Sequence, residues 1–291
     1  MNIDRLRRVR FFRGLRLFAC FFAAGVLLAR CTSAPPPLPP PEEEQPPGAV
    51  VVVEEIPSLF VSPKGSDSAG GFTRQTALRS LDAALNAVGE SGIKRIVILG
   101  RLSAESEALR AYPRGEASVF FISNTGAEEI LITGEGETGA GEEEAALCAD
   151  GTEKKVITIS GESRVRFENI TISGGSALVP DIPGGIGGGL YIDEGAQVTL
   201  GAGTRVVSNT AVFGAGAAVW TDGRLVLEDG ADIRDNYTSA FTYMAMQASP
   251  SGGGVFVSRL GELVMRGGEI SGNRAYSSGG GVSVENSGRF T

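Results

Sequence analysis

The second half of the chain repeats a pattern of short apolar runs separated by glycine-rich turns. The units begin at four glycines, 27, 38 and 27 residues apart: Gly187, Gly214, Gly252 and Gly279. Each complete unit ends on an asparagine: Asn209, Asn236 and Asn273. Three apolar runs recur in register between these markers, and the middle one is Val198–Leu200, Leu225–Leu227 and Leu263–Met265. The pattern predicts three brief strands per unit, each paired with the equivalent strand of the next unit.

Stacked units of this kind predict an all-β fold, a right-handed parallel β-helix whose solenoid of strands, about 4.8 Å apart, encloses an aliphatic core. Glycine suits turns with positive φ, while asparagine tolerates the same conformation and its amide can hydrogen-bond from unit to unit. We therefore assign turn and ladder roles to the repeated residues: Gly188, Gly189, Asn209, Gly214, Gly216, Asn236, Gly253, Gly254, Asn273, Gly280 and Gly281. Phosphate binding is not indicated, because no strand-GxGxxG-helix or P-loop context surrounds these glycines.

One unit is eleven residues longer than its neighbours, which predicts a loop around Tyr243 to Ser251 that projects from the stack. The loop region holds a cluster of apolar side chains: Phe241, Tyr243, Met244 and Met246. Such a cluster in a loop is a candidate contact surface for a partner. The alternative is that these side chains fold back on the strands.

A helix and several less regular strands are predicted before the repeats. Leu78, Leu81, Leu85 and Val88 recur at three- and four-residue spacing between Thr76 and Gly89, which predicts an amphipathic helix that caps the open end of the stack. Four β-rich runs follow: Arg95–Leu99, Ser118–Ile122, Glu129–Thr133 and Lys155–Ile159. We expect residues 58–160 to form this cap and irregular early coils, and residues 161–291 to form the regular repeats.

The first 57 residues have the pattern of an export signal followed by a tether. Six arginines lie between Asp4 and Arg16, and the uncharged run Leu17–Ala29 follows them. That run is shorter than the roughly 20 residues that span a bilayer as a helix, and it fits the core of a signal peptide. We therefore expect residues 1–30 to be a signal peptide and the proline-rich residues 31–57 to be an extended linker.

Composition and charge exclude several kinds of chemistry. The chain has no histidine, which removes the usual general base at neutral pH and the commonest zinc ligand. Cys148 is the one cysteine of the body, so a disulfide framework cannot form. Loss of the seven arginines and one aspartate before Cys31 leaves 19 basic and 33 acidic residues, a formal charge of −14. Nucleic acid is therefore not an expected partner, and we expect neither a metal nor a cofactor.

The repeats resemble those of chlamydial polymorphic outer-membrane proteins and of related β-helix proteins of spirochaetes. Their signature joins a GG-aliphatic-aliphatic/Tyr motif to F-x-x-N. The stretch from Gly188 to Tyr191 matches the first motif fully, and those from Gly253 and Gly280 match it in part. The second motif keeps its asparagine but has an aliphatic residue in place of Phe: Val206 with Asn209, Ile233 with Asn236, and Ile270 with Asn273.

Two further segments resemble known features of exported proteins. The VSPKGSDS stretch from Val61 and the helix after it look like the entry and cap of pectin-lyase-like β-helix proteins. Leu28 to Cys31 resembles the lipobox of bacterial lipoproteins, with Arg30 where that family has a small residue. The resemblance implies lipidation at Cys31, which would then be the mature N-terminus. It implies an exported protein, held as a lipoprotein at the outer membrane or cell surface, or secreted.

These features favour a non-catalytic structural or adhesive protein tethered to a bacterial envelope. Its expected partner is a host-surface protein or a glycan. The alternative is a carbohydrate-active enzyme, a polysaccharide lyase or glycoside hydrolase, since pectin-lyase-like folds also host such activities. Five carboxylates are available to it: Asp181, Asp193, Asp222, Asp232 and Asp235. They lie in turns and loops, where aspartate is common for conformational reasons.

The last repeat ends at Thr291, thirteen residues into its unit. An open end of stacked strands would expose strand edges and apolar side chains. We therefore expect the regular repeats to be truncated there, with further C-terminal coils or another subunit covering the open end.

Overall fold

The described part of the chain is mostly β-structure, and its sheets are parallel, which confirms the predicted all-β class. The computed structural model describes residues 56–107, 118–126, 128–135, 144–178, 185–239 and 249–291. Several predicted features lie outside the described residues: the signal peptide, nearly all of the linker, Cys31, Asp181, and the loop cluster of Phe241, Tyr243, Met244 and Met246.

The first described elements are a short strand, a 3-10 turn and a helix: β1 (Leu59–Val61), η1 (Arg74–Thr76) and α1 (Leu81–Ser91). The predicted helix between Thr76 and Gly89 is therefore misplaced at both ends. Its start is later because Leu78 is still extended and bridges Val61, while Ser80 caps the helix by accepting a hydrogen bond from Ala83 N. Its end is later because Gly92, and not Gly89, takes the left-handed C-cap conformation.

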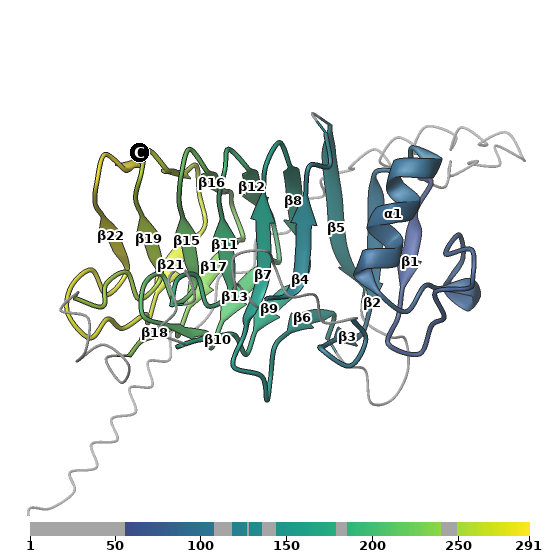
Figure 1. The fold of residues 1–291 in the computed structure, drawn as a ribbon, viewed down its shortest axis with the longest axis horizontal. Helices are drawn as coiled ribbons and strands as arrows, with labels where there is room; N and C mark the ends of the chain where they lie inside the picture. Colours follow the sequence, from purple (N-terminus) through teal and green to yellow (C-terminus); the bar gives the residue numbers. More distant parts are fainter. Residues whose placement is uncertain (1–55, 108–117, 127, 136–143, 179–184, 240–248) are drawn as a thin grey trace, which may run out of the picture. The chain divides into compact units, whose positions relative to one another are not determined.

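The helix packs one apolar face on the end of the sheets. Leu81, Ala84 and Val88 are buried in the same core cluster as Leu59 and Val61 of β1. Figure 1 shows α1 beside β1 and β2. The stripe read from the sequence thus covers the core, although the helix bounds differ.

Six strands follow before the regular repeats: β2 (Arg95–Leu99), β3 (Arg101–Leu102), β4 (Ser118–Ser123), β5 (Glu129–Glu135), β6 (Ala146–Cys148) and β7 (Lys155–Ser160). They include all four predicted runs. The two that sequence reasoning missed, β3 and β6, are only two and three residues long. Cys148, at the end of β6, is buried, and its Sγ lies 3.1 Å from the carbonyl oxygen of Leu102.

The remaining strands are short and recur in a fixed order. They are β8 (Arg164–Glu168), β9 (Thr171–Ser173), β10 (Ser176–Ala177), β11 (Leu190–Ile192), β12 (Gln197–Leu200), β13 (Arg205–Val207), β14 (Thr210–Ala211), β15 (Ala217–Val219), β16 (Arg224–Leu227), β17 (Asp232–Arg234), β18 (Tyr237–Thr238), β19 (Val255–Val257), β20 (Glu262–Met265), β21 (Glu269–Ser271), β22 (Val282–Val284) and β23 (Arg289–Phe290).

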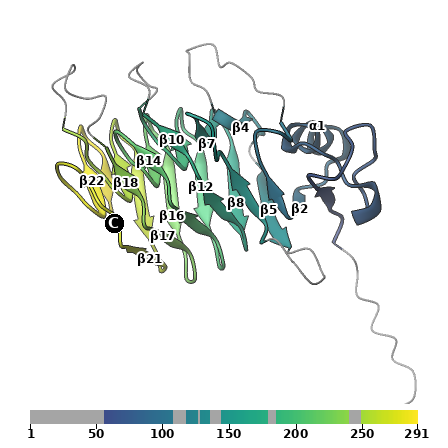
Figure 2. The ribbon, with the colours of Figure 1, turned by 90° about the horizontal axis from the view of Figure 1, so that it is seen from below.

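Equivalent strands of successive units pair side by side in four parallel sheets (Figures 1 and 2). The first sheet has the order β1-β2-β5-β8-β12-β16-β20-β23, the second β4-β7-β11-β15-β19-β22 and the third β3-β6-β9-β13-β17-β21. A fourth sheet, β10-β14-β18, was not predicted. Three strands per unit is therefore an undercount, because two-residue strands such as Thr210–Ala211 follow the unit's asparagine directly and leave no apolar run to read.

The register follows the spacing of the glycines. Leu190 pairs with Ala217, Ala217 with Val255, and Val255 with Val282, which reproduces the intervals of 27, 38 and 27 residues. The third sheet differs by one position, since Ile233 pairs with Ile270 only 37 residues later. The connection from β20 to β21 is thus one residue shorter than that from β16 to β17 in the preceding unit. The two isoleucines still face each other.

Candidate functional site

The asparagines that end the units form a line of hydrogen bonds. Asn236 Nδ2 donates to Val206 O at 2.9 Å and to Asn273 Oδ1 at 3.0 Å. Asn236 Oδ1 accepts from both nitrogens of Asn209, at 3.0 and 3.1 Å. Asn209 and Asn236 are each 1% exposed. Their amides therefore stabilise the contact between units and are not available to a ligand.

The repeated glycines divide into two kinds, which corrects their common assignment to positive-φ turns. Positive φ is confined to the first glycine of each triplet: Gly187 (72°), Gly214 (62°), Gly252 (70°) and Gly279 (64°). Five others lack room for a side chain: Gly188, Gly189, Gly216, Gly253 and Gly254. Around Gly280 and Gly281, in the last unit, there is more space. The five glycines that lack room for a side chain therefore allow close backbone approach between units.

Four of the five candidate aspartates are described, and each has a local role. Asp193 Oδ2 accepts from the Tyr191 hydroxyl at 2.9 Å, and Asp193 Oδ1 from Glu194 N at 2.9 Å. Asp222 has a φ of 59°, the left-handed conformation common for aspartate in turns. Asp232 and Asp235 come together, on either side of one guanidinium.

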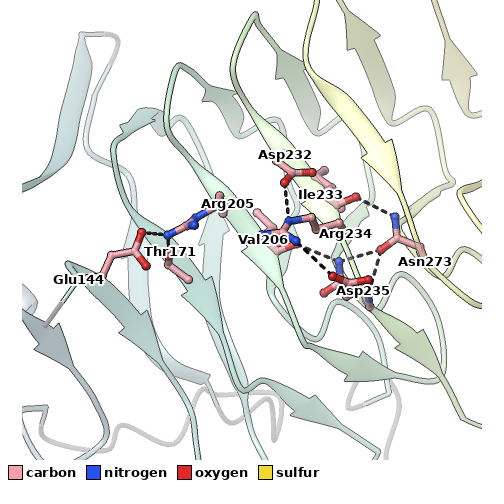
Figure 3. Close-up of polar contacts among 10 residues, drawn as sticks. Glu144, Thr171, Arg205, Val206, Asp232, Ile233, Arg234, Asp235 and Asn273 are labelled. Atoms are coloured by element: carbon pink, nitrogen blue, oxygen red, sulfur yellow. Dashed lines mark hydrogen bonds and ion pairs between the residues drawn. The ribbon is translucent and has the colours of Figure 1, made fainter. Parts of the chain in front are cut away.

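That guanidinium belongs to Arg234, which lies between the two carboxylates (Figure 3). Arg234 Nε is 2.6 Å from Asp232 Oδ2, and Nη1 is 3.5 Å from Asp235 Oδ2. The two carboxylates therefore point at a shared cation and not at a common open space. Among the described residues no group of three acidic or cysteine side chains could hold a metal ion.

Charged residues cover the side of the first sheet that faces away from the core. Arg166 donates to Glu168 and to Glu228, at 2.6 Å in both cases, and Arg224 lies 3.0 Å from Glu262. The hydrogen bond from Arg166 lowers the pKa of Glu228. Arg166 and Glu168 lie in the same strand, β8. The pair of Arg166 with Glu228 reaches from β8 to the end of β16, and the pair of Arg224 with Glu262 joins β16 to β20, so these two pairs reinforce the register. The third sheet has a similar pair of Arg205 with Glu144.

The second sheet differs, because aromatic residues lie on its side away from the core. Tyr191, Ala218 and Phe256 are successive register partners, and all three are buried. The Phe256 ring centroid is 5.1 Å from that of Phe213 and 5.9 Å from that of Trp220. The sheet thus carries an apolar layer on both sides, consistent with parallel sheets whose two faces are covered.

A shallow groove with one exposed aromatic side chain, Tyr237, lies beside the fourth sheet. It has a volume of about 360 Å³ and is lined by Asp235, Asn236, Tyr237, Gly272 and Arg274. Tyr237 is 43% exposed, and Tyr276, close by in the chain, is 60% exposed. We name Tyr237, Arg274 and Tyr276 the tyrosine–arginine patch. It is a candidate ligand surface, because exposed tyrosine and arginine are the residues enriched at recognition surfaces.

Sequence reasoning missed this patch. It assigned ligand contact to the inserted loop, whose four named side chains lie outside the described residues. A usable signal exists in the alignment of the units: Tyr237 follows the ladder asparagine, where the preceding unit has Thr210. A tyrosine at a repeat position that accepts threonine is not required by packing.

The comparisons with known proteins give no family. No family model, no curated protein and no solved structure matches this chain. Among the described residues, no helix has both the length and the apolar character needed to cross a membrane.

Proposed function

We propose that this chain is a non-catalytic adhesive protein, displayed at the surface of a bacterial envelope on a right-handed parallel β-helix. In this proposal each unit is one coil, and the four sheets are its walls. Crossover connections between parallel strands of one sheet are right-handed in about 98% of cases, which supports a right-handed β-helix. The glycine and asparagine motifs support a likeness to chlamydial outer-membrane repeats, and α1 supports a pectin-lyase-like cap.

The observation that carries the proposal is the strict register of the four sheets. Because each strand pairs with its equivalent in the next unit, side chains on the solvent side form fixed rows, such as Gln197, Arg224 and Glu262. A rigid array of this kind suits a protein that presents side chains at a distance from the cell. The predicted signal peptide, proline-rich linker and lipidated Cys31 would supply export and tethering.

The local roles of the candidate aspartates favour adhesion over catalysis. A glycosidase needs one carboxyl group as an acid and a second as a base or nucleophile, both facing the substrate. Here Asp232 and Asp235 face Arg234, and Asp193 accepts from Tyr191. The carboxylates of Asp193, Asp232 and Asp235 are thus accounted for by structural contacts, without a lyase or hydrolase activity.

Surface display is tested in intact cells with a palmitate analogue and external protease. We expect labelling that is lost in Cys31→Ala, and cleavage of the body from outside. An unlabelled protein found free in the medium would overturn the lipid tether. Protein that resists external protease but is cleaved after the cells are opened would overturn surface display.

The choice between adhesin and enzyme is tested on the purified chain. Saturable binding to a host-cell or glycan surface, with no new reducing or unsaturated ends on polygalacturonate, is the expected result. Turnover that disappears in Asp232→Asn or Asp235→Asn would overturn the adhesive assignment in favour of a carbohydrate-active enzyme.

A further inference from the structure

We propose that the tyrosine–arginine patch binds an acidic saccharide, with Arg274 pairing to the anionic group and the two tyrosines contacting the sugar. This proposal rests on the adhesive function above and names the class of ligand. Acidic saccharide here means a sugar unit that carries a carboxylate or a sulfate.

The three residues are brought close in the backbone by contacts between two successive units. Tyr237, at the start of β18, forms an isolated parallel bridge with Arg274, and Arg274 N donates to Asn236 O at 2.9 Å. Tyr276 N donates to the hydroxyl of Thr238 at 2.9 Å, which fixes Tyr276 next to the end of β18. The patch is therefore held by backbone geometry that the asparagine ladder stabilises directly beneath it.

Arg274 differs from the arginines that brace the sheets. Arg166, Arg205, Arg224 and Arg234 all pair with carboxylates. Arg274 is exposed, and its guanidinium makes no ion pair or side-chain hydrogen bond with any described residue. A guanidinium offers a planar fork that matches a carboxylate or sulfate oxygen pair, so Arg274 is positioned for an external anion.

The tyrosines supply the complementary part of a sugar site. Each has an apolar ring for the C–H face of a pyranose and a hydroxyl that can donate or accept a hydrogen bond. Asp235 also lines the groove, and its carboxylate is paired with Arg234. The groove volume of about 360 Å³ is at the lower end of the range for small-molecule sites, which suits one or two sugar units.

The negative charge of the whole chain makes binding of an anionic ligand depend on a local cation. The chain has a formal net charge of −8, so a polyanion is repelled in general and binding needs a local cation. Affinity for an acidic saccharide should therefore depend on Arg274 and should weaken as salt is added.

Calorimetric titration of the purified chain tests the site with three probes. One is a glucuronate-containing tetrasaccharide, the second is the same saccharide with its carboxyl groups reduced to alcohols, and the third is a sulfated galactan tetrasaccharide without carboxylates. We expect binding of at least one charged probe and at least tenfold weaker binding of the reduced probe. The two charged probes distinguish a carboxylate from a sulfate ligand.

Variants locate the binding. Arg274→Gln should weaken the charged probe at least tenfold, with Arg274→Lys retaining part of the affinity. Tyr276→Ala should weaken it about five- to tenfold, and Tyr276→Phe much less. Arg164→Gln and Phe72→Ala change an exposed arginine and an exposed aromatic residue elsewhere and should leave affinity unchanged.

Three results would overturn the assignment. They are the absence of binding by either charged saccharide, equal losses in Arg274→Gln and Arg164→Gln, and equally tight binding of an oligoglutamate peptide. The last result would replace the saccharide by an acidic protein segment. Surface display is measured separately in cells. A chain that is displayed but binds no acidic saccharide would therefore overturn the ligand assignment and not the surface location.

Discussion

Gly216 lies directly against Asn236, the ladder asparagine of its own unit. A Cβ atom added to Gly216 would be 2.9 Å from Asn236 Nδ2 and 2.6 Å from Gly254 O of the next unit. The same arrangement recurs where Gly254 approaches Asn273, with a Cβ-to-Nδ2 distance of 2.8 Å. The glycine turn and the asparagine ladder are therefore one structural device, in which the missing side chain leaves space for the amide.

This relationship predicts a large difference between two equivalent glycines. Gly216→Ala should lower the free energy of unfolding by about 2 kcal/mol, because backbone and a buried amide must both move. Gly281→Ala is the matched control, since its Cβ would meet only Ile270 Cγ2, at 3.8 Å. Urea unfolding followed by circular dichroism measures both. Equal midpoints would show that the close approach does not constrain the turn.

Loss of one ladder amide should be costly in the middle of the stack. Asn236→Ala removes the acceptor of both Asn209 N and Asn209 Nδ2, and a donor to Val206 O, all of them buried groups. We expect a loss of about 2–4 kcal/mol in the free energy of unfolding. Asn286→Ala, which removes one hydrogen bond to Ser258 Oγ in an exposed turn, should cost much less. A similar loss in both variants would contradict the role of the ladder.

The sequence predicted register well because glycine spacing is a strict geometric requirement. Leu190, Ala217 and Val255 pair in register although they are 27 and 38 residues apart, because the eleven extra residues lie between strands. The same reasoning could not find the fourth sheet. A two-residue strand such as Tyr237–Thr238 has no periodicity of its own and is defined only by its neighbours.

Helix bounds and the ligand-contact surface were predictable only in part, for a related reason. Gly89 and Gly92 are equally good helix terminators by residue type, and tertiary contacts decide between them. The tyrosine–arginine patch joins Tyr237 to Arg274, 37 residues away, through a strand pairing too short to read from the sequence. Residue types alone directed attention to the inserted loop instead.

The misplaced helix terminus gives a stabilising substitution. Gly89 lies inside α1, and a Cβ added there meets nothing within 4 Å. Gly89→Ala should therefore raise the free energy of unfolding by about 0.5–1 kcal/mol through helix propensity. Gly92→Ala is the contrast, because Gly92 has a φ of 73° and alanine there is strained. A Gly89→Ala protein that melts earlier than the unaltered chain would refute the assigned helix bounds.

Glu107 predicts a pH dependence of stability. Its carboxylate accepts from Leu81 N at 2.6 Å at the start of α1, and burial raises its pKa from 4.5 to about 7. Because the folded-state pKa is raised, its contribution to stability is fully present below pH 4.5 and is lost as the pH rises through 7. Glu107→Gln removes this titration, so the variant should gain stability relative to the unaltered chain between pH 5 and pH 8. Parallel curves of the free energy of unfolding against pH for the two proteins would contradict this role of Glu107.

Removal of one whole unit is the most direct test of the repeat. Deletion of residues 188–214 joins Gly187 to Ala215 and removes β11 to β14 together. Ile157 and Ala217 both pair with Leu190, so they can pair with each other once Leu190 is removed. In the same way, Arg164 and Arg224 both pair with Gln197 and can pair with each other.

The shortened chain should therefore fold with the same parallel sheets and unfold cooperatively, with a smaller dependence of the free energy of unfolding on urea, because less surface is buried. Deletion of residues 188–201 is the control, since it removes about half a unit and places the strands of the third sheet opposite those of the second. That chain should aggregate or remain unfolded by circular dichroism and gel filtration. Equal behaviour of the two deletions would show that the 27-residue register does not determine the fold.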